Sequence, residues 1–458
     1  MPRSIAFDGF PDVTTNSTVM ATCLRSDSNL YNIYENVKTL EGYSFDDHIQ
    51  LGLDDPLASG CGCCCLEEDS YKRFHEFYHT LICTYQAENE PISSTACHRL
   101  NVLNLEDYRY SIDYNYVKDV QVQTRRNVSG FKFSPKCSRA ERRKIFKIVE
   151  EAIQVQYPES SGLTHLYDIS LERKKMLQSV GEYLEKPDKR SLCYRSGGSR
   201  DWPDGRGVVF TPDASVSVWV NEEDNIRIFA RETEKSTNIV NVLERVADCD
   251  VYLEKSLCDI GGWSYMHDTH FGYLTTDPTK LGVLGIKITI QTVAIHGQST
   301  CNALFQLCNK FKVDLHYDPD DKHSSLDDLK PTGIMFDLIT RPSVFSSEDD
   351  RVGRFLECVK AIIRLDEHVL LHGDHDADGF LSRLIASPVE YSWCKLRSDS
   401  CQSGESLPSS RGAMSLLSVI SPRHWSMEKV IIFCDNFCSF NINNYSLHTI
   451  LDREMNVY

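Results

Sequence analysis

The stretch VWVNEEDNIRI, residues 218–228, places a charged segment between two apolar ones. Val216, Val218 and Val220 alternate with other residues, so they share one face of a strand, and a returning strand begins at Ile226. Two strands joined by a short polar turn predict a β-hairpin.

Three carboxylates in a row, Glu222, Glu223 and Asp224, then gather at the bend of this hairpin. Paired carboxylates match the planar fork of donors on a guanidinium, so they could orient such a group and accept its proton. A solvated acidic turn is the alternative interpretation of the same residues.

The sequence around the hairpin mixes strands and helices. Ser138 and Glu141 form a capping box, which predicts a helix from that point, and apolar residues follow on one face: Ile145, Ile148, Val149, Ala152 and Ile153. Helices are also expected at 236–247, at 300–312 and up to about residue 366, and an apolar strand at 281–295. Because no strict βαβ rhythm appears, we expect an α+β fold.

The chain divides into three parts. Residues 1–110 predict a small all-α N-terminal domain, in which Phe45, Ile49 and Leu53 recur at helical spacing. Residues 111–366 form a larger domain with an antiparallel β-sheet flanked by helices. Residues 367–458 change character and are expected to be a C-terminal extension.

Composition limits the partners. The 458 residues carry 49 basic and 66 acidic side chains, a net charge of 49 − 66 = −17. Such a surface repels phosphate backbones and anionic headgroups, so we expect neither nucleic acid nor a membrane as partner, and any bound anion needs a local cluster of cations. No signal peptide or apolar run of membrane length is present, and we expect a cytoplasmic protein with reduced cysteines.

Two motifs raise the question of a metal. The cysteines of SGCGCCC, residues 59–65, have no second Cys-x-x-Cys pair, and adjacent thiolates cannot easily share one zinc ion. HGDHDADGFL, from residue 372, is similar to the start of an EF-hand loop, but Ile385 stands where a bidentate Glu is needed. We favour a solvated acidic turn over a calcium site and expect no metal ligands.

Several stretches together carry a resemblance to a known family. RDWPDGRG at 200–207, the hairpin at 218–228 and HDTHFGYLTTDPTKLG at 267–282 are similar to the guanidino (phosphagen) kinases, the family of creatine kinase and arginine kinase. The similarity extends to residues 113–143 and 42–60, in order and at family-like spacing. It covers about 350 residues and implies a helical N-domain beside an antiparallel sheet flanked by helices.

The resemblance also implies site residues. Glu223, with Glu222 nearby, would orient the guanidinium, and Asp277 stands at the family's reactive cysteine. Ser59, Gly60 and Gly62 match the loop with which arginine-type members grip the amino-acid end of the substrate, although Cys64 replaces the usual tyrosine of that loop. The implied substrate is therefore L-arginine.

The family binds ATP phosphates with about five arginines, and most are replaced. Gln121, Gln123 and Ile286 stand at three of these positions, whereas Arg227 is kept. Arg126, Arg125 and Lys287 are possible substitutes. We take Arg126 with Arg227 as the ATP ligands, and Arg125 shares strand parity with Gln121 and Gln123. Lys287 follows Ile286 and should point to the opposite face unless a bulge intervenes.

The mobile loop of the family has no arginine here. No Arg occurs between Leu281 and Thr340, and the loop segment HYDPDDKHSS, residues 316–325, is acidic. Asp320 or Asp321 could approximate the second substrate carboxylate of arginine kinases.

Two functional hypotheses follow. The first is an arginine kinase-like ATP:guanidino phosphotransferase that uses Mg-ATP if it is active, with weak or absent activity because cations that neutralise phosphate are missing. The second is a non-catalytic member that senses a guanidine or serves as a scaffold. Either would be a monomer or a homodimer.

Overall fold

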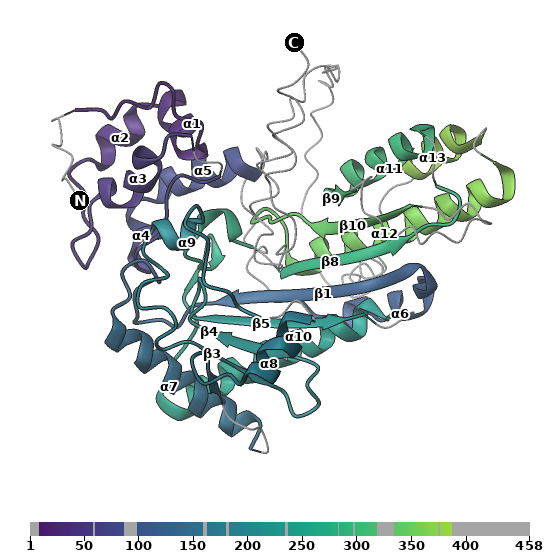
Figure 1. The fold of residues 1–458 in the computed structure, drawn as a ribbon. Coiled ribbons are helices and arrows are strands. Elements are labelled where there is room, and N and C mark those ends of the chain that lie inside the picture. The colour runs from purple at the N-terminus through teal and green to yellow at the C-terminus, as the bar shows by residue number, and fades with distance from the viewer. Residues whose placement is uncertain are drawn as a thin grey trace, which may run out of the picture.

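The computed structural model describes residues 9–57, 60–86, 99–158, 163–179, 183–233, 237–282, 284–295, 298–317, 334–373 and 376–386. Two large apolar cores organise these residues, one in a helical N-terminal part and one around a long β-sheet. Figure 1 shows these two parts of the fold. The predicted α+β class and the arrangement of the two parts are confirmed.

The N-terminal part is a group of short helices. Its helices are α1 (Val19–Ser26), α2 (Asn29–Tyr34), α3 (Phe45–Asp54), α4 (Asp69–Arg73) and α5 (His75–Gln86). Ser44 begins α3 with a capping box to Asp47, and Phe45 and Ile49 are fully buried one turn apart, as their spacing predicts. Residues of the larger part, among them Phe271 and Leu281, complete this core, so the two parts pack directly against each other.

The larger part is built on one antiparallel sheet. Its strands, in spatial order, are β2 (Thr164–His165), β3 (Gly207–Phe210), β4 (Ser217–Val220), β5 (Ile226–Glu232), β1 (Val117–Arg126), β8 (Leu284–Gln291), β10 (Met335–Thr340) and β9 (Val313–His316). A small ribbon of β6 (His267–Asp268) and β7 (Gly272–Tyr273) stands apart. The predicted hairpin is β4–β5, with Val220 opposite Ile226.

Alternation along the strands gives the sheet two unlike faces. Val120 and Val122 of β1 lie in the large apolar core, whereas Gln121, Gln123 and Arg125 point to the other side. We call this second side the polar face; it also carries the alternate residues of β5, β8 and β10.

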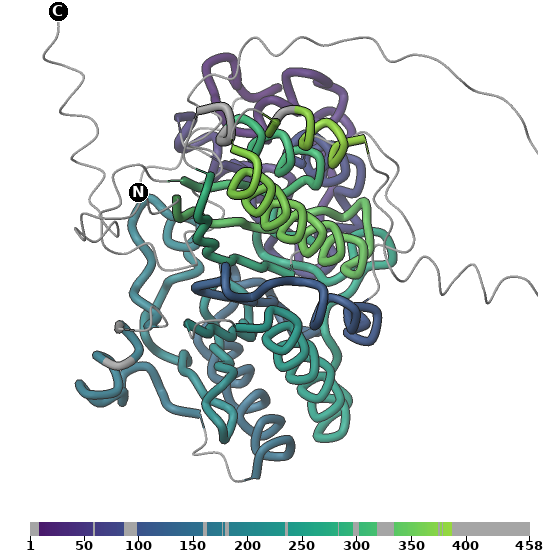
Figure 2. Tube along the Cα trace, turned by 90° about the vertical axis from the view of Figure 1, so that its right-hand side faces the viewer, coloured from purple at the N-terminus to yellow at the C-terminus, as the bar shows by residue number. Residues whose placement is uncertain are grey.

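Long helices cover the apolar face. They are α7 (Arg139–Gln156), α10 (Ile239–Gly261), α11 (Gln298–Phe311), α12 (Glu348–His372) and α13 (Ala377–Ala386), and α10 and α12 run in front of the sheet in Figure 2. The predicted capping box of Ser138 and Glu141 begins α7, and the predicted apolar stripe of that helix is buried. The shorter helices are η1 (Val102–Leu105), α6 (Tyr108–Ser111), η2 (Tyr114–Tyr116), α8 (Leu171–Ser179), α9 (Leu192–Arg195) and η3 (Pro278–Lys280).

Both predicted boundaries of the larger part shift in the structure. Leu105 and Tyr108 lie in the core of the large sheet, so this core begins before residue 110. At the other end α12 continues to His372, and Leu381 of α13 is buried in the same core. The apolar pattern, which continues through Val369, carries the helix past residue 366.

The described helices include none that is both long and apolar enough to cross a bilayer. Most of the predicted C-terminal extension, residues 387–458, falls outside the described residues.

Candidate functional site at the acidic bend

The acidic bend lies inside the protein. The exposed fractions are 7% for Glu222, 7% for Glu223 and 1% for Asp224, which excludes the solvated acidic turn. Asn221 opens the bend with φ of 58°, a left-handed conformation that Asn tolerates better than most residues, and its amide donates to the carbonyls of Arg142 and Gly205.

Neighbouring segments hold the bend in place. Asp224 Oδ1 accepts hydrogen bonds from Asn127 Nδ2 at 2.8 Å and from the backbone N–H of Thr276 at 2.8 Å. Asn225 Oδ1 accepts from Val128 N at 3.0 Å. Asp224 is thus a structural residue that ties the end of β1 and the segment before Asp277 to the hairpin.

Three cations neutralise the other two carboxylates of the bend. Arg125 Nη1 lies 3.2 Å from Glu222 Oε2 and 3.6 Å from Glu223 Oε2, and Arg227 Nη1 lies 3.5 Å from Glu222 Oε1. Lys280 Nζ donates to Glu223 Oε2 at 2.5 Å. Each carboxylate predicted to hold a guanidinium therefore already holds cations of the chain itself.

The pKa shifts reflect this pairing. Burial acts to raise the pKa of Glu223, but Lys280 and Arg125 outweigh it, so the pKa is lowered. Burial also opposes the charge of Lys280, whose pKa is nevertheless raised, chiefly by Glu223. The buried ion pair of Glu223 and Lys280 is thus charged on both sides at neutral pH.

Asp277 lies on the other side of the Lys280 ammonium. Its Oδ2 is 3.9 Å from Nζ, and its Oδ1 caps η3 by accepting from Thr279 N at 3.0 Å. Burial raises the pKa of Asp277 against the effect of Lys280, and the like charge of Glu223 adds to the rise. Lys280 therefore stands between two buried carboxylates, those of Glu223 and Asp277.

The glycine loop after α3 lies close to this cluster. Cys65 N donates to the carbonyl of Thr276 at 2.9 Å, which joins the loop to the residue before Asp277. The carbonyls of Gly60 and Cys61 accept from the first N–H groups of α1, so these backbone groups cap a helix. Ser59, the third predicted loop residue, falls outside the described residues.

Gly62 is required by its surroundings. It has φ of 76°, and a Cβ at this position would lie 2.5 Å from the side chain of Thr18. The cysteines around it are buried, and burial raises the pKa of Cys64 to about 12, which disfavours the thiolate that a metal or a nucleophilic reaction needs.

The polar face places the predicted strand positions together. Gln123 Oε1 accepts from Arg227 Nε at 2.9 Å, and Gln121 Nε2 donates to Asp119 Oδ2 at 2.7 Å. Asp119 in turn binds Arg231 at 3.0 Å. The two glutamines therefore lie on the predicted face, but they supply no positive charge.

Strand β8 presents Lys287 and not Ile286 to this face. Ile286 is fully buried in the apolar core, whereas Lys287 lies opposite Gln121 and binds Asp337 of β10 at 2.7 Å. The two residues do point to opposite faces, as alternation predicts, and it is the lysine that faces the site.

The choice of Arg126 as an ATP ligand does not agree with the geometry. Arg126 points to the helical side of the sheet, where it binds Asp250 at 2.7 Å and lies over the ring of Tyr273. Arg125 is the residue that reaches the bend, and its parity with Gln121 and Gln123 was the signal that could have selected it. Sequence spacing alone did not reveal that Lys280 pairs with Glu223.

The described parts of the two metal motifs form no metal site. Within the described ranges, no three His, Cys, Asp or Glu side chains are grouped so that they could hold a metal ion. The second half of the EF-hand-like segment is helix α13 and not the predicted turn, and Asp376 binds His368 at 3.2 Å. Asp374, and most of the acidic loop with Asp320 and Asp321, fall outside the described residues.

A helical domain beside this antiparallel sheet, with a carboxylate bend at the junction, defines a guanidino phosphotransferase fold. The family model of the ATP:guanido phosphotransferase C-terminal catalytic domain matches residues 139–369, and that of the N-terminal domain matches residues 14–83. The chain therefore belongs to the ATP:guanido phosphotransferase family, the phosphagen kinases.

Curated relatives and solved structures agree with this assignment. The chain is 27% identical over 368 residues to creatine kinase M-type of Rattus norvegicus, covering 78% of this chain and 91% of the relative. It is 28% identical over 365 residues to the Homo sapiens enzyme, with 78% and 91% covered.

Among solved structures, the fold is similar to lombricine kinase, with a TM-score of 0.67 at 23% identity, covering 83% of this chain and 98% of that chain. It is also similar to the duplicated taurocyamine kinase of Schistosoma mansoni, with a TM-score of 0.59 at 19% identity, covering 79% and 48%.

Proposed function

We propose that this protein is a phosphagen kinase relative in which phosphoryl transfer is residual or absent, and whose guanidino position is filled by its own Lys280. The observation that carries the proposal is the contact of Lys280 Nζ with Glu223 at 2.5 Å, with Asp277 on its other side. A guanidino substrate would have to displace this ammonium before it could use the same carboxylate.

The charge balance of the polar face supports the same conclusion. The cations Arg125, Arg227, Arg231, Lys280 and Lys287 are matched by the carboxylates Asp119, Glu222, Glu223, Asp277 and Asp337, which gives 5 − 5 = 0. Phosphoryl transfer depends on cations that neutralise the phosphates of ATP.

The residues on this face therefore do not fit Mg-ATP in the way that the family's arginine-rich site would. No excess positive charge remains among the paired groups, and Gln121 and Gln123 add only neutral amides. If each missing charge-assisted contact is worth about 1.5–3 kcal/mol, three of them remove about 4.5–9 kcal/mol. By transition-state arithmetic this is a loss of roughly 10³- to 10⁶-fold in rate.

The substrate class remains guanidino compounds, and L-arginine is our candidate because the glycine loop has the arginine-type length. The curated relatives reported above are creatine kinases, so creatine is the competing candidate. A non-catalytic role, as a guanidine sensor or a scaffold, requires the same carboxylates but no nucleotide.

Calorimetry on the purified full chain tests the proposal. We expect no saturable binding of Mg-ATP and, in a coupled assay, no turnover that depends on L-arginine or creatine. Turnover in the range of about 1–100 per second, which is usual for kinases, would refute the proposal.

A triple variant tests whether Lys280 and the missing arginines cause the expected loss of nucleotide binding. The triple variant Lys280→Asn, Gln121→Arg and Gln123→Arg frees Glu223 and adds two cations to the polar face, so we expect it to gain nucleotide binding. Ile286 is left unchanged because an arginine there would be buried in the apolar core. The matched control, Lys255→Asn, Gln154→Arg and Gln178→Arg, makes the same charge change at exposed positions. If the two triple variants bound Mg-ATP equally, the loss of nucleotide binding could not be assigned to Lys280, Gln121 and Gln123.

A further inference from the structure

Four cysteines lie together in the loop between α3 and α4 of the N-terminal part: Cys61, Cys63, Cys64 and Cys65. All four are buried, and each is a free thiol in the structure. The backbone N–H of Cys65 joins this loop to the carbonyl of Thr276, close to the acidic bend. The function proposed above gives these thiols no role.

Two of these sulfurs are already close to each other. Cys61 Sγ lies 3.2 Å from Cys63 Sγ, and a disulfide bond is about 2.05 Å long, so the two sulfurs need to approach by only about 1.2 Å. Gly62 lies between them with φ of 76°, and it belongs to the bend of the backbone that brings the two side chains together. The pair can therefore close with little movement of the chain.

The two thiols differ in their access to solvent. Cys61 is 5% exposed, the largest fraction among the four cysteines, whereas Cys63 is fully buried. Burial raises the pKa of Cys63 well above its ordinary value, and the hydrogen bond with Cys61 adds to the rise. Cys63 therefore keeps its proton and donates it toward Cys61 Sγ, so Cys61 is the sulfur that can react first with a small oxidant.

We propose that Cys61 and Cys63 form a reversible oxidation site, at which a peroxide converts the two thiols into a disulfide within the loop. In the first step the Cys61 sulfur attacks one peroxide oxygen, the O–O bond breaks, and a sulfenic acid and one water form. In the second step the Cys63 sulfur attacks the Cys61 sulfur, the S–S bond forms, and the sulfenic hydroxyl leaves with the Cys63 proton as a second water.

The two steps balance. Two thiols lose two electrons and two protons, and hydrogen peroxide takes them up to become two water molecules. A dithiol reductant reverses the oxidation by thiol–disulfide exchange. The site is independent of the function proposed above, because it uses no residue of the polar face.

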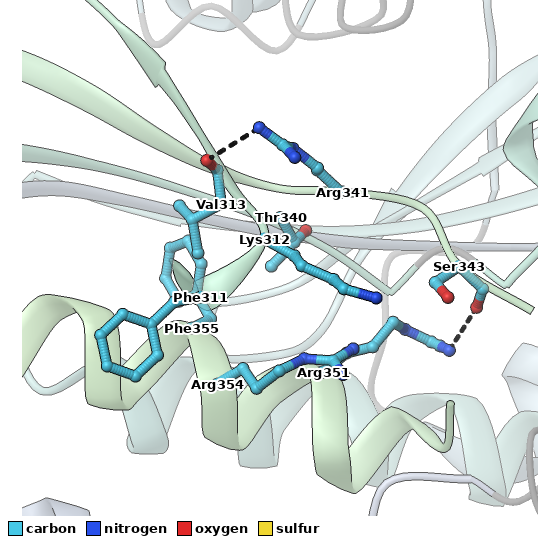
Figure 3. Close-up of a pocket in the computed structure, with 9 residues that line it drawn as sticks. All are labelled: Phe311, Lys312, Val313, Thr340, Arg341, Ser343, Arg351, Arg354 and Phe355. Carbon is cyan, nitrogen blue, oxygen red and sulfur yellow. Dashed lines mark hydrogen bonds between the residues drawn. The ribbon is translucent and has the colours of Figure 1, made fainter. Parts of the chain in front are cut away.

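A second pair of cysteines provides an internal comparison. Cys358 of α12 shares a hydrogen bond with Cys308 of α11, and both lie in the large core. Each is about one helical turn from Phe355 or Phe311, two aromatic residues that line the pocket in Figure 3. Both cysteines stand on long packed helices, so a disulfide between them would have to shift a helix. We expect a peroxide to oxidise this pair more slowly than the pair in the loop.

Peptide mapping of the folded full chain tests the site. Hydrogen peroxide is added, the protein is then denatured, its free thiols are alkylated, and trypsin cuts it after Lys and Arg. One tryptic peptide, residues 39–72, holds the four loop cysteines and no other, and another, residues 355–360, holds Cys358 alone. We expect the first peptide to fall from four labels to two and to lose two hydrogens, while the second keeps its label. Dithiothreitol should restore all four labels.

Two variants identify the sulfurs. Cys61→Ala should keep its three remaining labels after peroxide, whereas Cys64→Ala, the matched control in the same loop, should still lose two of three. Thermal unfolding confirms that each variant is folded. If Cys61→Ala is not folded, Cys63→Ala takes its place with the same expected result.

Four results would overturn the proposal. They are four labels kept by the full chain, two labels lost by Cys61→Ala, oxygen gained by the loop peptide in place of hydrogen lost, and loss of the Cys358 label as fast as the loop labels. Pairing of Cys61 with Cys23 would also overturn it, and this pairing would remove one label from the loop peptide and one from the tryptic peptide of residues 4–25.

Discussion

Replacement of Lys280 by Met is the most direct perturbation of the site. The change removes the ammonium between Glu223 and Asp277 while it keeps an unbranched side chain of similar length. The nearest cation left to Glu223 would be the more distant Arg125, at 3.6 Å, and two buried carboxylates would face each other without the cation between them.

The expected cost follows from burial. The side chain of Lys280 is 14% exposed and that of Glu223 is 9% exposed, so water screens their pair little. Removal of one partner from a buried pair typically costs about 3–5 kcal/mol. Lys287 is the matched control, because it binds Asp337 at 2.7 Å with exposures of 18% and 27%. The substitution Lys287→Met should lower the free energy of unfolding by about 1 kcal/mol or less.

Urea denaturation at pH 7.5 measures both changes in the free energy of unfolding. A double-mutant cycle with Glu223→Gln then isolates the pairwise energy. The cost of Lys280→Met should be smaller at pH 5, because without the cation the buried carboxylates take up protons more readily and protonation removes the unpaired charge. A cost below about 1 kcal/mol, or a coupling energy near zero, would refute the idea that Lys280 fills the site.

Three further predictions concern the frame around the site. Burial lowers the pKa of His48 to about 4. Below pH 6.5 the unfolded chain binds a proton at this histidine that the folded chain does not bind, so the free energy of unfolding should fall by up to about 3 kcal/mol between pH 6.5 and 4. Urea denaturation of His48→Gln should show less of this pH dependence. Gly62→Ala should lower the free energy of unfolding by more than 2 kcal/mol, because its Cβ would meet Thr18 at 2.5 Å, whereas Gly42→Ala, with open space around it, should cost less. Ser138→Ala should lower the same quantity by about 1 kcal/mol by removing the cap of α7, and a cost near zero would contradict the role of the capping box.

Much of the fold was predictable because local patterns and long-range packing agree. The capping box at Ser138, the alternation of Val216, Val218 and Val220, and the helical spacing of Phe45 and Ile49 each predict an element that the structure contains. The domain boundaries were less predictable. Helix α12 continues past residue 366 because its apolar pattern continues and no local signal ends the helix there.

The site was only partly predictable, for a different reason. Strand parity is a local property, and it correctly groups Gln121 and Gln123 with Arg125. The partner of a charged side chain is a property of the tertiary fold. Lys280 is 57 positions from Glu223 in the chain, so no spacing rule connects their charges.

The net charge of −17 led to the expectation that an anion would need a local cluster of cations. The structure refines this expectation, because a cluster attracts an anion only if carboxylates have not already matched it. On the polar face, ion pairs match five cations with five carboxylates. The polar face should therefore bind phosphate weakly, because its cations are already matched. If calorimetric titration showed tight binding of phosphate, and Lys287→Met weakened it, the pairing of charges would not govern anion binding on the polar face.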